Sequence, residues 1–267
     1  MKIFDCVTFF EENRLMKLRF NILDDYIDHF VVCESKYDHQ GRKKKINFNK
    51  NKYSKFKKKI IHIIVDSFPK NINPWERQAF QREEILKNLK KVEDNDLILF
   101  SDPDEIPNLS NIKKIKFKKK YLIFLQNLFY YKLNIKETTL GNNWEGTRGC
   151  LKKNLKSIDF MRQKVLKKNL KYGFWRLDKE KSIQIIKNGG WHFSYLLTPN
   201  EIQRKITTFA HTELNKKKFK SLKNIKYCIK NFKDLFHRKI TYKKIKIDNS
   251  FPEYIKKNKK KFSKWII

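Results

Sequence analysis

Three acidic side chains follow a short apolar run in "LILFSDPDEIPN", residues 97–108 of an otherwise basic chain. Because the residue before a proline is kept out of the helical region, we expect extended backbone at Asp102. In extended backbone, residues i and i+2 point the same way, so Asp102 and Asp104 should project together and Glu105 to the other side. Two converging carboxylates suit a hard cation, Mg²⁺ or Mn²⁺, that bridges to substrate phosphates. The alternative is an Asp- and Pro-rich turn without a ligand, and such turns are common.

A second set of candidates lies in "GGWHFSY", residues 189–195. The glycine pair lets the backbone approach a ligand closely. His192 is a candidate metal ligand or phosphate contact, and Trp191 offers a stacking surface. A lone histidine is more often structural, so His192 carries little weight by itself. In "WEGTRG", residues 144–149, Glu145 and Arg148 stand between glycines as a candidate substrate loop.

A charged residue is expected on the inward face of a helix over residues 75–89. Asn73, Pro74 and Glu76 have the pattern of an N-cap, a first helical residue and a capping box. At 100° per residue, Arg82 falls inside the apolar stripe of this helix, where a guanidinium costs free energy unless it is paired. Arg82 is therefore expected to meet a carboxylate of the acidic turn or a ligand phosphate. A structural salt bridge is an equal alternative.

The elements around these residues alternate between strands and helices. Strands are predicted over residues 2–10, 28–35, 60–66 and 96–102, and helices over 12–27 and 75–89. This order predicts βαβ units and a parallel sheet, in which ligands bind beyond the carboxyl ends of the strands. The acidic turn follows the fourth strand, and Glu34 ends the second. Later in the chain we predict a strand over 121–135, loops over 142–150 and 188–196, a helix near 199–209 and a helical tail from about residue 220.

Length and cysteine usage bound the class of protein. The 267 residues predict one domain over residues 1–220, with a basic helical extension over 221–267 packed on it. The four cysteines show no zinc spacing, and Cys6 and Cys33 lie in apolar runs, which indicates buried thiols and a reducing compartment. Asp5 interrupts the first apolar stretch, so we expect no signal peptide, and no window reaches the length of a membrane span. We therefore expect a cytoplasmic protein, peripheral at most to the inner face of a membrane.

The formal net charge is +35. A field of this sign attracts nucleic acid, anionic lipid or nucleotide phosphates, although scattered lysines are also typical of a solvated surface shaped by coding bias. A nucleic-acid-binding protein without catalytic activity is therefore the alternative function. The chain has no helix-turn-helix, zinc-finger or RNP signature, so we expect no specific nucleic acid. It also lacks a P-loop, which argues against phosphoryl transfer.

Several motifs in one order resemble glycosyltransferase family 17. They are "FDCVTFFEENRLMKLRFNIL", "IDHFVVCES", "WERQAFQR", "LILFSDPDEIP", "GGWHFSYL" and "FAHTEL", and the resemblance extends over residues 2–240. It implies a GT-A-like nucleotide-sugar-binding fold, with a mixed, mostly parallel sheet flanked by helices and a metal-binding DxD motif. It also implies an inverting transfer from a UDP-sugar to a glycan or lipid-linked glycan hydroxyl, with UDP-N-acetylglucosamine as the first candidate donor. The cofactor implied is Mn²⁺ or Mg²⁺.

The resemblance also implies roles for individual residues. Asp104 would be the main metal ligand, with Asp102 near the ribose or metal and His192 near the diphosphate and metal. The general base that inversion requires is not singled out, and Glu105 and Glu145 are the candidates. The substrate contacts expected are Glu34, Trp75, Gln81, Arg82, Arg148 and Trp191. The eukaryotic members carry a membrane anchor and a lumenal stem that are not seen here, so a cytoplasmic enzyme of surface-glycan synthesis fits better than a Golgi enzyme. The lysines would then hold it at an anionic membrane.

Overall fold

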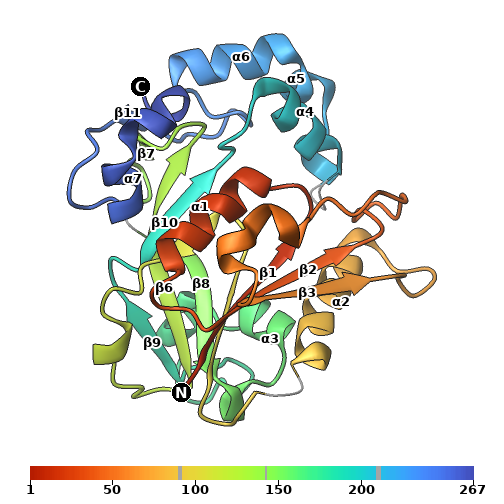
Figure 1. Ribbon diagram of the computed structural model, residues 1–267, viewed down its shortest axis with the longest axis vertical. Coiled ribbons are helices and arrows are strands. Elements are labelled where there is room, and N and C mark those ends of the chain that lie inside the picture. Colours follow the sequence, from red (N-terminus) through yellow and green to blue (C-terminus); the bar gives the residue numbers. More distant parts are fainter. Residues whose placement is uncertain (90–91, 142, 209–211) are drawn as a thin grey trace.

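The computed structural model describes residues 1–89, 92–141, 143–208 and 212–267 (Figure 1). The strands are β1 (Ile3–Phe9), β2 (His29–Ser35), β3 (Ile60–Val65), β4 (Leu97–Ser101), β5 (Glu105–Pro107), β6 (Tyr121–Tyr130), β7 (Ile135–Glu137), β8 (Trp144–Leu151), β9 (Ile183–Ile186), β10 (Gly190–Ser194) and β11 (Tyr242–Lys244). The α-helices are α1 (Asn13–Leu23), α2 (Pro74–Asn88), α3 (Ile158–Gln163), α4 (Pro199–Thr208), α5 (Lys217–Lys220), α6 (Leu222–Asn231) and α7 (Glu253–Lys257). The 3₁₀ helices are η1 (Lys50–Phe56), η2 (Ile112–Lys114), η3 (Lys152–Asn154), η4 (Lys167–Lys171), η5 (Thr212–Leu214) and η6 (Lys259–Trp265).

The N-terminal half of the sheet is parallel. Strands β4, β1, β2 and β3 lie side by side in that order, and every pairing among them is parallel. The apolar runs of β4, β1 and β2 are buried on both faces, as expected for strands covered by helices on either side, whereas the edge strand β3 is only partly buried. The predicted α/β fold with a mixed sheet flanked by helices is confirmed. The four predicted strands and two predicted helices of this half are each present, with ends that differ by a few residues.

The second half of the sheet is built around the ten-residue strand β6. Strand β8 lies antiparallel between β4 and β6, while β9 and β10 pair with β6 in parallel. The loops predicted over 142–150 and 188–196 are therefore wrong, because the segments form β8 and β10; residue 142 itself lies outside the described residues. Their glycines permit close strand packing rather than loops. A Cβ at Gly149 would meet the Leu99 side chain at 2.6 Å.

Helices cover the two faces of the sheet and create separate cores. On one face, α1 packs Leu15 and Phe20 against Val7 of β1. On the other face, Ile85 of α2 and Ile158 of α3 pack with residues of β1, β2 and β4. Helix α2 begins with the predicted capping box, in which the Asn73 side chain accepts from the amides of Trp75 and Glu76 while the Glu76 carboxylate accepts from the Asn73 amide. The sheet edge that carries the acidic turn is thus held from both faces.

The chain beyond residue 220 packs onto the same body. Helices α4, α5 and α6 contact one another and gather above β10 at the top of Figure 1. Strand β11 pairs with β7, so the predicted helical tail also contributes a strand to the sheet. Helix α7 packs on α1, and the Arg14 guanidinium lies 4.1 Å from the ring centroid of Trp265. The helix predicted near 199–209 ends at Thr208, and Phe209 lies outside the described residues.

Two sequence-based expectations concern the chain as a whole. All four cysteines are buried and unpaired with one another, as expected for Cys6 and Cys33. Within the described ranges, none of the helices combines the length and apolar character needed to cross a bilayer.

Candidate active site

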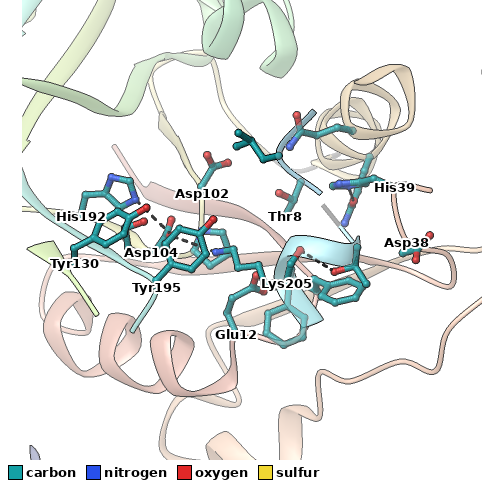
Figure 2. Close-up of a pocket in the computed structure, with 18 of the residues that line it drawn as sticks. Thr8, Glu12, Asp38, His39, Asp102, Asp104, Tyr130, His192, Tyr195 and Lys205 are labelled. Atoms are coloured by element: carbon teal, nitrogen blue, oxygen red, sulfur yellow. Dashed lines mark hydrogen bonds and ion pairs between the residues drawn. The ribbon is translucent and has the colours of Figure 1, made fainter. Parts of the chain in front are cut away.

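A cavity of about 450 Å³ opens at the carboxyl ends of the parallel strands. Thr8 at the end of β1, Ser35 at the end of β2 and Asp102 after β4 contribute to its lining, and β10 and α4 close the other side. Figure 2 shows the cavity, with Asp104, His192, Tyr130 and Tyr195 grouped at one end and Asp38 and His39 at the other. The cavity therefore lies where ligand-binding side chains were expected, beyond the carboxyl ends of these strands.

A buried arginine of α1 holds the acidic turn by hydrogen bonds. The amide of Glu105 donates to the carbonyl of Asp102 at 3.0 Å, which closes a tight turn. Arg19 of α1 is fully buried; it donates to the carbonyl of Glu105 at 2.6 Å and pairs with the carboxylate of Asp5 in β1. It also donates to Ser101 at 3.0 Å. A charge buried this deeply requires a partner, and the pairing with Asp5 ties α1, β1 and the acidic turn together.

The three acids of the turn do not point as the extended backbone predicted. Asp102 and Glu105 share one cation, Arg162 of α3, whose guanidinium lies 2.6 Å from Asp102 and 2.9 Å from Glu105. Asp104 faces elsewhere. The prediction that Asp102 and Asp104 project together is therefore wrong, because the backbone turns between them and the i, i+2 rule applies only to extended chain. Burial acts to raise the pKa of Asp102, but the charges of Arg162, Arg82 and His192 together outweigh it, so the net pKa is lowered.

Asp104 meets two nitrogen-bearing side chains inside the cavity. Its Oδ2 lies 3.5 Å from Nε2 of His192 on β10 and 3.5 Å from Nζ of Lys205 on α4. Burial opposes ionisation, but Lys205 and then His192 hold the pKa of Asp104 well below its usual range. Desolvation acts to lower the pKa of Lys205, but the charges of Asp104 and Glu12, with smaller contributions from Tyr195 and Asp102, together outweigh it, so the pKa is raised. Asp104 and Lys205 therefore carry opposite charges at neutral pH.

The predicted metal ligands converge in part. Asp104 and His192 face each other, and the buried Nδ1 of His192 has no hydrogen-bond partner among the described residues, which leaves the ring free to serve a ligand. Asp102 lines the same cavity, but its carboxylate is bound to Arg162. Within the described ranges, no three His, Cys, Asp or Glu side chains form a ready-made metal site. The residues present fit a cation that takes two ligands from the chain and the rest from phosphate and water, as Mg²⁺ does in many phosphate sites.

The opposite end of the cavity holds a polar pair beside the second strand. Gln81 of α2 donates to the carbonyl of Cys33 at 2.8 Å, and its Oε1 lies 3.1 Å from Nε2 of His39. Burial lowers the pKa of His39, and the hydrogen bond with Gln81 opposes this only in part. His39 is therefore a neutral imidazole at neutral pH. Gln81 lines the cavity, as predicted for a substrate contact, although its donor group is committed to the backbone.

Neither candidate base reaches the cavity. Glu105 is fully buried, and its carboxylate accepts from Arg162 and from Nε1 of Trp144. Glu145 lies on β8, where its carboxylate accepts from the amide of Lys167 and contacts Arg148. A base must approach the acceptor hydroxyl within hydrogen-bonding distance, so the structure does not support either glutamate in that role. Glu105 is instead a buried structural carboxylate of the acidic turn, held by Arg162 and Trp144.

Five of the six predicted substrate contacts lie outside the cavity lining. Glu34 pairs with Lys44 and accepts from the amides of Asn47 and Phe48, so it orders the loop after β2. Arg82 pairs with Asp159 of α3 at 2.7 Å, which is the structural salt bridge left open above. The remaining three are Arg148, buried on β8 where it donates to carbonyls of the same strand; Trp191, whose Nε1 donates to the carbonyl of Ser250; and Trp75, exposed on α2.

The glycine pair before Trp191 also has a structural cause. A Cβ at Gly189 would lie 2.8 Å from backbone atoms of Phe124 and Leu125, and one at Gly190 would lie 2.2 Å from the carbonyl of Ile106. Gly190 has φ +137°, a conformation that side chains disfavour. These glycines let β10 approach β5 and β6, which brings His192 to the cavity, and neither glycine lines that cavity.

Sequence reasoning missed Glu12, His39, Arg162 and Lys205. Lys205 had a usable signal, because it neighbours the buried Ile202 and Ile206 within the predicted helix, as Arg82 does in α2. Arg162 had no such sequence signal, because the short helix α3 that carries it was not predicted. Part of the motif "FAHTEL", residues 209–211, lies outside the described residues.

Comparison with known proteins connects this geometry to one family. The model of glycosyltransferase family 17 matches residues 1–145, which include β1, β2, α2 and the acidic turn. The chain is similar to Beta-1,4-mannosyl-glycoprotein 4-beta-N-acetylglucosaminyltransferase of Rattus norvegicus and of Homo sapiens, each 24% identical over 129 residues. Those matches cover 43% of this chain but only 23% and 24% of the relatives, so they span about a quarter of the relatives' length.

The solved structures that resemble this chain are more distant in sequence. The crystal structure of S. aureus TarS 1-349 is 14% identical and covers 84% of this chain and 69% of that chain, with a TM-score of 0.40. The glycosyltransferase GlyE in Streptococcus pneumoniae is 11% identical and covers 70% of this chain and 46% of that chain, with a TM-score of 0.35. The family model, by contrast, matches more than half of the sequence and includes three of the strands that end at the cavity. The chain therefore belongs to glycosyltransferase family 17.

Proposed function

We propose that the protein transfers a sugar from a UDP-sugar to a glycan or lipid-linked glycan hydroxyl, with inversion and with the help of Mn²⁺ or Mg²⁺. N-acetylglucosamine is the first candidate sugar, because the similar curated proteins are named for its transfer. The observation that carries the proposal is the convergence of Asp104, His192 and Lys205 in the cavity at the strand ends. In a family 17 chain, this is the part of the fold where a nucleotide-sugar is expected.

The leaving diphosphate would bind at the end of the cavity near Asp104. Lys205 and Arg238 line this region, and the Arg238 guanidinium also contacts the Tyr130 hydroxyl at 3.5 Å. Fixed cations stabilise the negative charge that develops on a departing diphosphate. Asp104 and His192 would hold the divalent cation, which when bound supplies further stabilisation of that charge. Before the cation binds, the charge of Lys205 keeps Asp104 ionised.

The sugar and the nucleoside would bind against the rest of the lining. Apolar and aromatic side chains make up much of it, including Phe10, Leu128, Tyr130, Trp144 and Tyr195. Tyr130 and Tyr195 lie with ring centroids 5.2 Å apart, and the Trp144 and His192 rings contact each other at 4.6 Å between centroids, tilted by 49°. Flat apolar surfaces with a few fixed polar groups are typical of small-molecule sites. The His39–Gln81 pair supplies such polar groups at the far end.

Glu12 is the carboxylate we assign as the general base. The other cavity acids pair with cations: Asp38 with Arg42, Asp102 with Arg162, and Asp104 with Lys205. Among the described residues, Glu12 forms no ion pair within 4.0 Å; one oxygen accepts from the amides of Phe10 and Glu11. Its second oxygen remains for an acceptor hydroxyl, which is what proton abstraction requires.

A donor-hydrolysis assay tests the proposed function. Purified protein is incubated with Mn²⁺ and a panel of nucleotide sugars, and released nucleotide is measured. Release from UDP-N-acetylglucosamine above all other donors is expected, and an Asp104→Ala variant should lose it. Asp25→Ala is the matched control, because Asp25 is exposed and does not line the cavity. No release from any sugar nucleotide, or full release by Asp104→Ala, would contradict the assignment.

The alternative of a nucleic-acid-binding protein has its own test. The observation that supports this alternative is the net charge of +35. It predicts binding to DNA or RNA whose affinity falls steeply with salt, measured by fluorescence anisotropy across a salt series. We expect no binding at physiological salt, since the sequence has no helix-turn-helix, zinc-finger or RNP signature.

A further inference from the structure

An apolar protrusion begins at the end of η4 and leads toward β9, and none of its residues lines the cavity. We call residues 170–177 the aromatic loop. Its large side chains are exposed to a degree unusual for their type: Leu170 44%, Tyr172 39%, Phe174 85%, Trp175 70% and Leu177 92%. A single exposed apolar residue needs no explanation, but five in eight consecutive positions form a patch. Such a patch on a protein of this charge indicates an interaction surface.

The aromatic loop has a fixed backbone. The ammonium group of Lys181 donates to the carbonyls of Gly173 at 2.6 Å, Phe174 at 3.2 Å and Arg176 at 3.0 Å. Gly173 leaves room for the Trp175 ring, which would lie 2.4 Å from a Cβ at that position. Phe174 and Trp175 contact each other edge to face, with centroids 5.3 Å apart. The apolar side chains therefore project from a structured turn, which lowers the entropy cost of binding.

Basic residues flank this tip along the chain, and we call them the lysine rim. Residues 167–181 hold six basic side chains and two acidic ones, for a net charge of +4. Asp178 is already paired with Arg176 at 2.7 Å and with Lys179 at 3.0 Å, so its charge is neutralised within the loop. Lys168 and Lys171 of η4 form no ion pair with any described residue. An apolar tip with unpaired lysines beside it matches the boundary between the acyl chains and headgroups of an anionic bilayer.

We propose that the aromatic loop inserts Phe174, Trp175 and Leu177 into the interface of a membrane that contains anionic lipids. The lysines of η4 then contact the lipid phosphates. A lipid surface fits better than a protein partner because tryptophan and phenylalanine at a tip with a lysine rim form the residue pattern of interfacial anchors. The inference does not depend on the proposed function, since it concerns residues outside the cavity.

Vesicle flotation tests the proposal. The wild-type chain is mixed with vesicles of phosphatidylcholine alone or of phosphatidylcholine with phosphatidylglycerol, at physiological salt. Binding to the anionic vesicles is expected, and a triple Phe174→Ser, Trp175→Ser, Leu177→Ser variant should bind at least about tenfold more weakly, because each buried apolar side chain favours insertion. The matched control is the pair Ile64→Ser and Tyr227→Ser, which removes exposed apolar side chains elsewhere and should bind like the wild type.

Two further readouts distinguish insertion of the loop from electrostatic attraction at the lipid surface and from misfolding of the variant. Lipids with brominated acyl chains should quench tryptophan emission in the wild type, and Trp175→Phe should remove most of that quenching while it keeps binding. Unchanged thermal unfolding of the triple variant shows that it is folded. Equal binding by the triple variant and the wild type would overturn the proposal in favour of general lysine attraction. Absence of binding to anionic vesicles would also overturn the proposal. So would gel filtration in which the wild type and the control variant are dimers but the triple variant is a monomer, because the loop would then be a dimer contact.

Discussion

The guanidinium of Arg162 donates to the carboxylate of Asp102 at 2.6 Å, although 60 residues separate them in the chain. The same group reaches both carboxylate oxygens of Glu105 at 2.9 Å. One arginine on a six-residue helix thus pairs with two of the three acids in the turn after β4. Asp104 is left as the acid that faces the cavity cations.

Removing Arg162 should destabilise the fold. In Arg162→Met, the fully buried Glu105 loses its cation, and breaking one side of a buried ion pair costs about 3–5 kcal/mol. We expect the free energy of unfolding, measured by urea titration, to fall by that amount. Arg204→Met is the matched control: its ion pair with Glu11 is largely exposed, so its effect should stay below about 1 kcal/mol. An Arg162→Met stability equal to that of the control would show that Glu105 is not held in this way.

Replacing His192 should weaken metal binding and leave the fold intact. If His192 and Asp104 hold the cation, His192→Ala should raise the Mn²⁺ concentration for half-maximal nucleotide release by about tenfold or more, on the order of what supporting groups of metal sites contribute. His29→Ala, at the opposite end of β2, is the control. Nucleotide release that continues after a chelator has removed all divalent metal would contradict the metal assignment. The proposed glycosyl transfer would still stand, with Lys205 as the cation beside Asp104.

Neutralising Glu12 should slow transfer without altering the donor site. Glu12→Gln keeps an oxygen to accept from the amides of Phe10 and Glu11 but removes the charge that accepts a proton. We expect a drop of about 10²–10⁴-fold in kcat, the usual contribution of a general base, together with loss of the acid limb of the pH–rate profile. Glu11→Gln is the neighbouring control. If Glu12→Gln keeps its rate and its acid limb, another group takes the proton.

His39 should make stability depend on pH below neutrality. Burial lowers its pKa in the folded protein from 6.5, so in the window below about pH 6.5 the unfolded chain binds the proton more readily. Stability is therefore expected to rise with pH through this window and to be lost as pH falls toward the folded pKa. His39→Asn should flatten the slope of unfolding free energy against pH, measured by urea titration. The pKa of His62 is also lowered by burial, so His62→Asn is the comparison that isolates the contribution of His39.

Sequence patterns located the acidic turn and the strand end that carries it, because these depend on local physics. Apolar runs, the capping box at Asn73 and the proline positions act over a few residues, and the structure contains the elements they predict. Patterns failed where packing between distant segments decides. Gly149 and Gly190 were predicted to lie in loops, but each allows two strands to approach at a distance that a side chain would forbid.

By itself, the sequence determined the α/β class, the parallel N-terminal strands and the placement of Asp102 and Asp104 beyond β4. The tertiary structure alone decided which cation each acid meets. Asp102 meets Arg162 of α3, and Asp104 meets His192 of β10 and Lys205 of α4, all of which lie far away in the chain. The physical reason is that charge pairing depends on distance in space, which the order of residues along the chain does not record until helices and strands have packed.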